Sequence, residues 1–541
     1  MMPLEAWLNS RFFFGLLAAL LILGVATQPA SRASSITREH PESSGRLRFP
    51  EGVWVGDLHL GGLYQDEARA RLERLALEHF FPPLPLDLDG QTLFLSPTQV
   101  HLQVDLDGVL TRAGTAGQEA LLRRAIFLPL SLGGEGTGAD FVGPRQVVIP
   151  LEASVDESLV RAFLEGIAAR WDTPPAPTRL IEITGTQDLL SLSIPAYRQE
   201  EGIPVPAFLA ACPGRQLDIE QAIPLVVRAL REGDRRPLRL PVRWIPAPRP
   251  DLRLLEEALA REAQGFAGVV GVYVRNLRTG EEAGLNADVA FSGASVIKIA
   301  IMALTYRDLA DIPSAVARDL WDMMVYSDND AANRLLALAG RGDGIRGAHE
   351  MTALMRDLGL EQSILCSPYG DPGRGWCPDV PVTVFRATGV PAAVTEADPD
   401  LRTTPREMGL LLGAIHECAN GRGPLVQRFA QQIEPRECQE MVALMGQNAD
   451  KERLVAGLPQ GVEAAHKSGW IPDMKADAGI VFAPSGPYVV SIFVWKGGAL
   501  SDTEGNRWIA RLSWLVYSFF NPLETVPAPA EPASALGSPS G

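Results

Sequence analysis

Three short motifs in the second half of the chain place hydroxyl groups and lysines at spacings that suit acyl transfer. They are Ser295-Val-Ile-Lys298, Ser327-Asp-Asn329 and Lys467-Ser-Gly469. A lysine held in a dry environment loses part of its preference for the charged form. Such a lysine can take the proton of a nearby serine hydroxyl and turn that serine into a nucleophile. The first motif therefore predicts Ser295 as the nucleophile and Lys298 as its base.

The residues around the first motif predict a buried helix. Residues 296–304 are apolar apart from Lys298, and a helix that is apolar almost all round is buried. We expect Ser295 to open this helix, with Lys298 on the same face one turn later. The positive end of the helix dipole would favour negative charge that develops at Ser295. Because a serine and a lysine three residues apart are common in helices, the other two motifs decide the assignment.

The second motif precedes a predicted helix that begins near Ala331. Ser327 can carry a proton to a leaving nitrogen, and Asn329 can offer its amide to a substrate amide and to the lysine. Taken alone, the serine and aspartate would be an ordinary helix N-cap.

The third motif lies in a predicted strand. Lys467 supplies positive charge for a substrate carboxylate, and Ser468 adds a hydroxyl donor. Gly469 would let a substrate lie close to the backbone, as if adding a strand. Taken alone, these residues would be an ordinary surface sequence.

In this order the motifs resemble the SxxK, SDN and KTG signature of class A β-lactamases and penicillin-binding proteins. Residues 251–521 thus resemble the class A β-lactamase family, and Thr403-Thr404-Pro405 resembles the family segment that opens the helix after the omega loop. The resemblance implies an oxyanion hole formed by the backbone amides of Ser295 and Trp470. It also implies catalytic roles for Ser295, Lys298, Ser327 and Lys467, and substrate binding by Asn329, Ser468, Gly469 and Trp470.

Two departures from the family pattern bear on turnover. Class A enzymes carry an omega-loop glutamate that activates the deacylating water, but residues 385–391, found by counting back from Pro405, contain no carboxylate. Glu396 is the nearest glutamate and the candidate deacylation base, with Asp398 and Asp379 as alternatives. The second departure is spacing, because the first two motifs lie unusually close together and the omega region looks enlarged around Cys366. We therefore expect slow deacylation.

Other chemistries are poorly supported. The seven histidines show neither HxH nor HExxH spacing, so a zinc site is not indicated. The stretch Gly293-Ala-Ser295-Val-Ile lacks the second glycine of a nucleophile elbow. We expect no metal or organic cofactor. The net charge of −16 and the absence of a basic stripe argue against nucleic acid as a partner.

The N-terminal 30 residues predict an export signal. Arg11 precedes the apolar run Phe12–Ala26, which is short for a spanning helix and suits a signal peptide. Residues 30–33 offer a cleavage site, and an uncleaved signal-anchor that holds the chain to the membrane through residues 12–26 is the alternative. Both interpretations predict an extracytoplasmic location, in the cell envelope or secreted.

The five cysteines fit an oxidising compartment. Four of them lie in the C-terminal half and allow three connectivities. We expect Cys366–Cys377 and Cys418–Cys438, because each pair closes a short loop, and Cys212 as a buried thiol outside these pairs.

A chain of 541 residues is too long for one core. We expect a polar linker at residues 31–46, an α+β region at 47–245, a proline-rich connector at 246–250, the hydrolase domain at 251–521 and a disordered tail at 522–541. The region 47–245 resembles the peptidoglycan-binding domains found beside VanW-like envelope proteins, which implies the cell wall as a partner. The alternative is a spacer that holds the hydrolase away from the membrane. The residues that carry this resemblance are Val55-Gly56, Leu60-Gly61-Gly62-Leu63, Glu67-Ala68, Pro213-Gly214 and Leu217-Asp218.

The expected fold class is α+β, with a C-terminal antiparallel sheet flanked by helices in three layers. Periodicity predicts helices over 251–263 and 504–517 and strands over 238–244, 268–276, 478–482 and 488–496. The expected function is a serine hydrolase that is acylated at Ser295 by β-lactams and opens the β-lactam amide slowly. A D-Ala-D-Ala peptidase or other enzyme acting on peptidoglycan stem peptides is one alternative. A penicillin-binding sensor that stays acylated is another.

Overall fold

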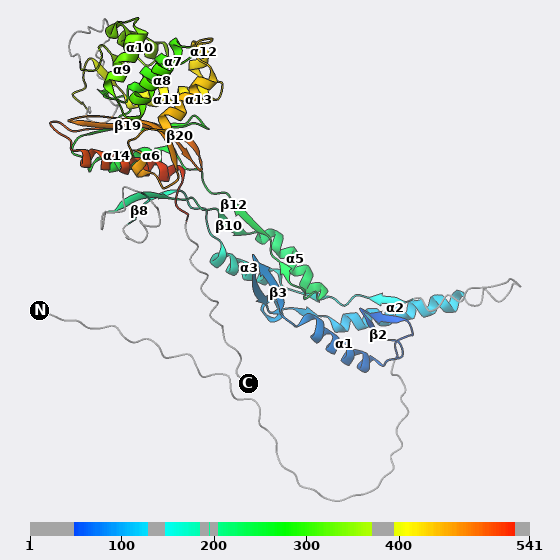
Figure 1. Cartoon of the computed structure of the whole chain (residues 1–541). Helices are drawn as coiled ribbons and strands as arrows, with labels where there is room; N and C mark the ends of the chain where they lie inside the picture. Colours follow the sequence, from blue (N-terminus) through cyan, green and yellow to red (C-terminus); the bar gives the residue numbers. More distant parts are fainter. Residues whose placement is uncertain (1–47, 128–145, 184–193, 195–203, 371–393, 525–541) are drawn as a thin grey trace, which may run out of the picture. The chain divides into compact units, whose positions relative to one another are not determined.

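The computed structural model describes residues 48–127, 146–183, 194, 204–370 and 394–524 (Figure 1). The chain divides into two compact units, and residues 156–228 group with the C-terminal region in the second of them. The first unit contains residues 1–84, 96–155 and 229–235. The boundary proposed at residues 246–250 stays a prediction.

The first unit is built around a three-stranded sheet in which β1 pairs with β2 in antiparallel and with β6 in parallel orientation. Val53 and Val55 are buried on either side of half-buried Trp54, as expected for a strand with one face on the core. Helix α1 buries every fourth residue from Ala68 to Phe80, and Ala68 and Leu72 pack in the same core as these valines. The elements are β1 (Val53–Val55), β2 (Leu58–His59), α1 (Gln65–Phe80), β5 (Gln103–Val104), α2 (Leu106–Phe127), β6 (Val147–Ile149) and β7 (Ala153–Ser154).

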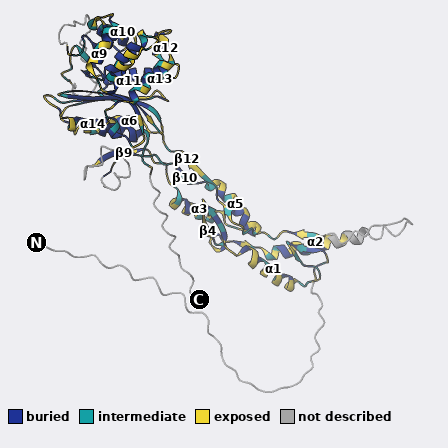
Figure 2. Ribbon diagram, in the orientation of Figure 1, coloured by how far each residue is buried: buried dark blue, intermediate teal, exposed yellow. Residues whose placement is uncertain are grey.

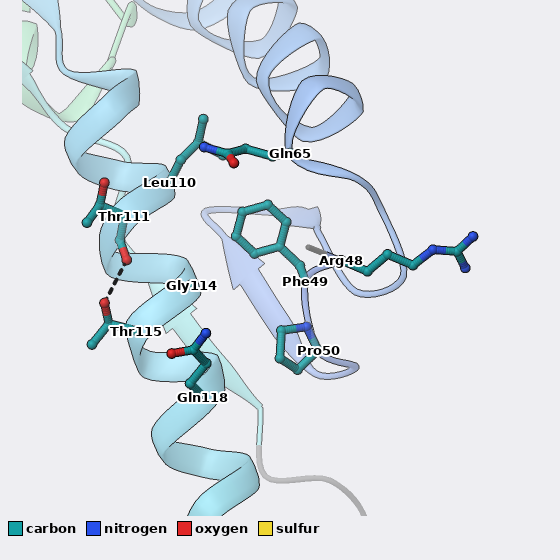
Figure 3. Close-up of a pocket in the computed structure, with 9 residues that line it drawn as sticks. All are labelled: Arg48, Phe49, Pro50, Gln65, Leu110, Thr111, Gly114, Thr115 and Gln118. Carbon is teal, nitrogen blue, oxygen red and sulfur yellow. Dashed lines mark hydrogen bonds between the residues drawn. The ribbon is translucent and has the colours of Figure 1, made fainter. Parts of the chain in front are cut away.

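A cavity of about 410 Å³ lies in the first unit, between residues 48–50, the start of α1 and the middle of α2 (Figure 3). Phe49, Pro50 and Leu110 give it apolar walls. The Thr115 hydroxyl faces the α2 backbone and donates to the Thr111 carbonyl oxygen at 3.0 Å. The cavity therefore combines an apolar lining with hydroxyls that the helix itself already engages.

The second unit has a five-stranded antiparallel sheet at its centre, in the order β14-β13-β20-β19-β18. The predicted hairpin strands are longer than expected, because pairing continues out to Met474 and Trp495 beyond the most apolar stretch. The sheet strands are β13 (Val269–Asn276), β14 (Glu282–Leu285), β18 (Glu463–Ile471), β19 (Met474–Ala483) and β20 (Gly486–Trp495).

Helices cover both faces of this sheet, which confirms the three-layer α+β prediction (Figure 1). Helices α6 and α14 pack on one face, and the helical segment between β15 and β18 packs on the other. Figure 2 shows the sheet as a buried layer between them. The helices are α6 (Leu252–Ala263), α7 (Lys298–Asp308), α8 (Ser314–Val325), α9 (Asn329–Ala339), α10 (Gly344–Asp357), α11 (Pro405–Ala419), α12 (Pro424–Arg428), α13 (Pro435–Gly446) and α14 (Asp502–Phe520).

The prediction that Ser295 opens a helix was wrong by one turn. Helix α7 begins at Lys298, and Ser295 lies in the tight turn before it. The turn is formed by short-range bonds in which the Lys298 amide donates to Ser295 O at 3.3 Å and the Ile299 amide donates to Val296 O at 3.2 Å. Ala294 has a φ of +42°, in the left-handed region, which redirects the chain into this turn. Every residue from Lys298 to Tyr306 is buried, as the apolar run predicts.

A second, small sheet lies beside the nucleophile turn, in the order β15-β17-β16. Its strands are β15 (Phe291–Ser292), β16 (Ile364–Leu365) and β17 (Leu401–Thr403). Because β17 pairs with both neighbours, it fixes residues 364–365 and 401–403 next to the strand that leads into Ser295.

Where the structure describes it, the rest of the second unit forms short strands and two helices, and the last residues of the second helix group with the first unit. The predicted strand over 238–244 is split into β11 and β12, because Pro241 lacks the amide that a central ladder position needs. The hairpin β8–β9 packs on α14 through Phe208, which is fully buried. These elements are β3 (Leu84–Leu88), β4 (Gln91–Leu95), α3 (Glu157–Trp171), β8 (Arg179–Ile183), β9 (Val205–Leu209), β10 (Gly214–Leu217), α5 (Ile219–Glu232), β11 (Leu238–Arg239) and β12 (Val242–Ile245).

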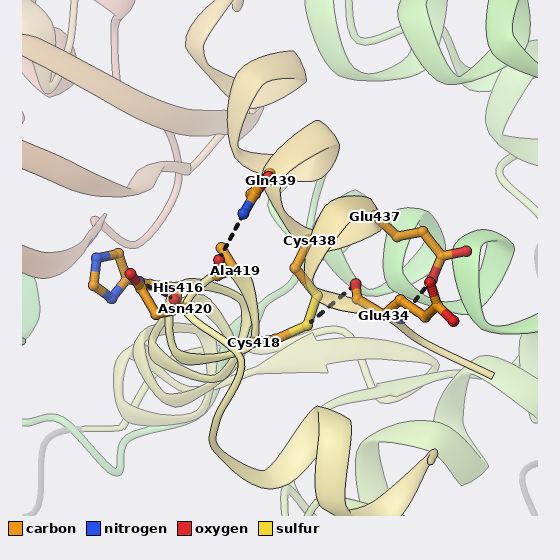
Figure 4. Close-up of a disulfide and its surroundings, with 8 residues drawn as sticks. All are labelled: His416, Cys418, Ala419, Asn420, Glu434, Glu437, Cys438 and Gln439. Carbon is orange, nitrogen blue, oxygen red and sulfur yellow. Dashed lines mark hydrogen bonds between the residues drawn. A yellow bond between two sulfur atoms is a disulfide. The ribbon is translucent and has the colours of Figure 1, made fainter. Parts of the chain in front are cut away.

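One predicted disulfide is confirmed. Cys418 at the end of α11 is bonded to Cys438 in α13 (Figure 4). Cys366 is also disulfide-bonded, while Cys377, its expected partner, lies outside the described residues. Cys212 is half-buried rather than buried, and its thiol donates to the Ala210 carbonyl oxygen at 3.8 Å.

Within the ranges that the structure describes, no helix is both long and apolar enough to cross a membrane. The apolar run Phe12–Ala26 lies outside those ranges.

Candidate active site

Lys298 lies at the centre of a hydrogen-bond network that joins all three sequence motifs. Its Nζ donates to Asn329 Oδ1 at 2.6 Å, to Ser327 O at 2.7 Å and to Ser327 Oγ at 3.4 Å. Lys467 Nζ donates to the same Ser327 Oγ at 3.0 Å. Ser327 thus lies between the two lysines, within reach of both.

The backbone of the second motif is held in an uncommon conformation. Ser327 has a φ of +62°, in the left-handed region, in the connection between α8 and α9. Asp328 caps α9 by accepting the Ala331 amide proton at 2.6 Å. The cap fixes the start of α9 and therefore the position of Asn329 beside Lys298. Left-handed non-glycine residues of this kind cluster at functional sites.

Both lysines are buried, and burial is the main reason that neither keeps its usual proton affinity. Burial lowers the pKa of Lys298 to about 7, assisted by the positive charge of Lys467 and opposed by Asp328. Burial likewise lowers the pKa of Lys467 to about 7, with Asp477 raising it and Arg453 lowering it. Near neutral pH each amine can therefore accept or release a proton.

A buried charged group supports Lys467 from its own sheet. Asp477 on β19 is fully buried and accepts a hydrogen bond from the Leu454 amide at 3.1 Å. His466, the residue before Lys467, is also buried, and its Nδ1 lies 2.9 Å from the same carboxylate. This pair places a carboxylate charge next to the strand that carries Lys467.

Gly469 brings strand β18 against the nucleophile turn. A Cβ atom at Gly469 would lie 2.9 Å from both the Ser295 and Val296 amide nitrogens, closer than real Cβ atoms approach. Glycine is therefore required here for the strand and the turn to meet. Ser295 is half-buried, and its Oγ makes no hydrogen bond within the described part of the chain.

Strand β18 is the edge strand of the five-stranded sheet as described, so its outer side is not paired with another strand of that sheet. Ser468 is buried, whereas the Trp470 side chain is 60% exposed, with Lys475 Nζ 5.5 Å from its ring centroid. An edge strand with a glycine can bind an extended substrate by backbone hydrogen bonds.

Sequence reasoning missed Tyr369 and Asn333. The Tyr369 hydroxyl donates to the Ala294 carbonyl oxygen at 2.9 Å, and its ring centroid lies 4.7 Å from Lys298 Nζ. The Asn333 side chain accepts from the Tyr369 amide at 2.8 Å and donates to the Tyr369 carbonyl at 2.9 Å. Asn333 follows Asn329 by one helical turn, and this i,i+4 spacing was the available signal.

The candidate deacylation bases are not joined to this network in the described residues. Glu396 is exposed and makes no hydrogen bond or ion pair there. Its segment runs beside β15, where the Asp398 amide donates to Ser292 Oγ at 2.9 Å. Asp379 and the stretch 385–391 lie outside the described residues. Glu396 and Asp398 as bases stay predictions.

No cluster of three or more metal-ligating side chains is present among the described residues.

Residues 254–312 and 315–520 match the model of the β-lactamase enzyme family. No curated protein matches the chain. Similar solved structures include PBP-A, at 21% identity, with 50% of this chain and 96% of that chain covered and a TM-score of 0.39. An ancestral class A β-lactamase shows 23% identity, covering 48% and 98%, with a TM-score of 0.37. A β-lactamase from Sphaerobacter thermophilus DSM 20745 shows 21% identity, covering 49% and 95%, with a TM-score of 0.36.

The C-terminal region of this chain therefore belongs to the β-lactamase enzyme family. The match does not extend to the N-terminal half, whose resemblance to peptidoglycan-binding domains stays a prediction.

Proposed function

We propose that residues 251–521 form a serine acyl-transfer enzyme that is acylated at Ser295 by β-lactams and hydrolyses them slowly. The observation that carries this proposal is the network in which Lys298 and Lys467 both bond to Ser327. It supports Lys298, three residues after Ser295, as the base and Ser327 as the proton donor to the leaving nitrogen.

In the proposed acylation, Ser295 Oγ attacks the β-lactam carbonyl carbon while Lys298 accepts the hydroxyl proton. Burial supports this role because it keeps a fraction of Lys298 neutral near pH 7. The ring C–N bond then breaks, and the nitrogen receives a proton from Ser327, which is replenished from Lys298 at 3.4 Å. The proton lost by Ser295 thus ends on the opened ring nitrogen.

The proposed oxyanion hole consists of the amides of Ser295 and Trp470. The close approach that Gly469 allows supports it, because this glycine joins strand β18 to the turn that holds the Ser295 amide. The charged form of Lys467, with the Ser468 hydroxyl, would bind the substrate carboxylate. The unpaired side of β18 would hold the substrate amide in an extended position.

Intact mass spectrometry after incubation with penicillin G, together with steady-state nitrocefin hydrolysis, tests this function. We expect an adduct of one penicillin on the wild type, none on Ser295→Ala, and slow nitrocefin turnover. An adduct retained in Ser295→Ala, or its absence from a folded wild type, would overturn the proposal. Release of D-alanine from a stem peptide ending in D-Ala-D-Ala, without any β-lactam adduct, would favour the peptidase alternative.

We also propose an extracytoplasmic location. The disulfide Cys418–Cys438 supports it, because such bonds persist in oxidising compartments, and so does the predicted export signal at residues 1–30. Protease added to intact cells should degrade the chain. Full protection until the cells are lysed would contradict this location.

A further inference from the structure

We infer that Tyr369 keeps the Ser295 acyl-enzyme long-lived, as a positioning residue whose phenol occupies the space beside the nucleophile turn and offers no base to a water molecule. This inference rests on the proposed function and explains why its second step is slow. It concerns a segment, residues 366–370, that no sequence motif indicated.

The phenol is held at both ends by parts of the acylation machinery. Its hydroxyl donates to the carbonyl oxygen of Ala294, the residue immediately before Ser295. Its ring lies against Lys298, with Nζ 4.7 Å from the centroid, a distance at which a cation and an aromatic face attract each other. Tyr369 therefore lies between the backbone that precedes the nucleophile and the lysine that activates it.

The backbone of Tyr369 is anchored as firmly as its side chain. Asn333 forms two hydrogen bonds to it, one with the amide at 2.8 Å and one with the carbonyl at 2.9 Å. Asn333 belongs to α9, the helix that also carries Asn329 of the second motif. The same helix thus positions both Asn329 of the active site and the backbone of Tyr369.

The phenol cannot act as a general base in this position. Its proton is already donated to Ala294 O, and burial raises the pKa of the Tyr369 phenol far above neutrality. Phenolate, the form able to take a proton from water, is therefore scarcely populated at neutral pH.

Two carboxylates on elements near Tyr369 are already engaged. Glu407 accepts hydrogen bonds from Ser363 Oγ at 2.6 Å and from the Gln362 amide at 2.8 Å. Asp328 is occupied in capping α9. Within the described residues, neither carboxylate is hydrogen-bonded to Ser295 or to Tyr369.

The step at issue is hydrolysis of the ester. A water oxygen must bond to the ester carbonyl carbon, its proton must pass to an acceptor, and the C–Oγ bond must break as Ser295 regains a proton. A positioned base contributes on the order of 10²–10⁴-fold to such a step. With Tyr369 in place, the lifetime of the acyl-enzyme is longer by about this factor than it would be with a positioned base. Such a lifetime suits lasting β-lactam capture better than rapid β-lactam destruction.

Tyr369→Glu and Tyr369→Phe test the inference in the full-length chain. The readouts are the rate of labelling by a fluorescent penicillin and, after removal of free label, the rate of label loss. We expect Tyr369→Glu, which is smaller and basic, to lose label at least about 10²-fold faster than wild type. Tyr369→Phe keeps the ring and should retain label as the wild type does. Tyr326→Glu is the control for added charge, because Tyr326 is 66% exposed and its substitution places the same carboxylate beside Ser327 instead of at the position of the phenol.

Each outcome distinguishes the inference from the function beneath it. If the wild type and Tyr369→Phe are never labelled at Ser295, the proposed function fails. If all variants are labelled but Tyr369→Glu releases label at the wild-type rate, or no faster than Tyr326→Glu, the role of Tyr369 is overturned. Fast release by the wild type that Tyr369→Phe abolishes would also overturn it, because the phenol would then be a catalyst. If Tyr369→Glu does not fold, Tyr369→Gln and Tyr369→Ala replace it. Faster loss of label from Tyr369→Ala than from Tyr369→Gln would support the role of the phenol in occupying space. Label retained by both variants for as long as by the wild type would contradict that role.

Discussion

The residues of the site share protons rather than carry fixed charges. Ser327 lies between two buried amines, and burial lowers the pKa of both Lys298 and Lys467 to about 7. Because both pKa values lie near 7, each amine is only partly protonated at neutral pH, and positive charge is divided between the two. The productive arrangement needs that charge on Lys467, to bind a carboxylate, and a neutral Lys298, to accept a proton.

The rate of acylation should therefore depend on pH with a maximum near 7. Below the maximum, Lys298 is protonated and cannot act as a base; above it, Lys467 loses the charge that attracts the substrate carboxylate. We expect the second-order rate constant for β-lactam labelling to fall about tenfold per pH unit on each side, measured from pH 5 to 9.

Lys467→Arg is the control for this profile, because a guanidinium stays charged throughout the range. The alkaline decline should disappear. The acid limb should remain and move to lower pH, since a permanent positive charge nearby favours neutral Lys298. A flat wild-type profile, or an alkaline decline that survives in Lys467→Arg, would contradict the assignment of roles to the two lysines.

At the scale of elements, apolar periodicity predicted the helices and strands in which one pattern of burial holds along the whole element. Helices α6 and α14 and strand β13 were predicted to within a few residues, and α7 is buried as its composition requires. The strand over 238–244 was wrong because Pro241 interrupts it. The start of α7 was misplaced because the turn at Ala294 depends on a tertiary contact with Gly469.

The site was predicted where a family signature connects residues that are distant in sequence, and it was missed where no signature does. The motif residues Lys298, Ser327, Asn329 and Lys467 do meet, although only a family signature could indicate that they would. Tyr369 and Asn333 are 36 residues apart, and no local pattern connects them. Pairs of this kind depend on which distant segments the fold brings together, here α9 and the chain after β16, and local periodicity does not encode that.

The disulfide between α11 and α13 should stabilise the helical layer without affecting the chemistry (Figure 4). It closes a loop of 20 residues, and cross-links of this size contribute about 3 kcal/mol to the free energy of unfolding. We expect Cys418→Ser/Cys438→Ser to lose about that much in a denaturant titration. Labelling by penicillin at 25 °C should stay within about twofold. Cys212→Ser is the control and should change stability little; an equal loss in both variants would show that the cross-link is not the cause.

At the scale of the whole molecule, the catalytic layers extend beyond residues 251–521. Val205 and Phe208 of β9 are fully buried in the cluster that includes α14. Trp514 Nε1 donates to the Pro206 carbonyl oxygen at 2.8 Å. The outer face of α14 is thus covered by a hairpin that comes before the proline-rich connector in sequence.

Two fragments separate catalysis from this cover. A fragment of residues 251–524 retains every proposed catalytic residue and should still be labelled at Ser295. It should unfold at a lower temperature than a fragment of residues 156–524, because Trp514 and Phe519 lose their cover and exposed apolar area costs about 25 cal/mol per Å². Melting curves and labelling of both fragments provide the measurement. Equal melting temperatures would mean that the hairpin contributes nothing, and loss of labelling in a folded 251–524 fragment would show that the site needs residues before 251.

The pairing of β9 with the segment after α14 has a mechanical consequence. The Leu523 amide donates to Phe208 O and the Ala210 amide donates to Leu523 O, both at 2.8 Å, in parallel orientation. Tension between the chain before β9 and the chain after Leu523 would load these bonds in shear, which requires both of them to break together. A force applied along the polypeptide would therefore be carried by this junction before it could separate β18 from the turn at Ser295.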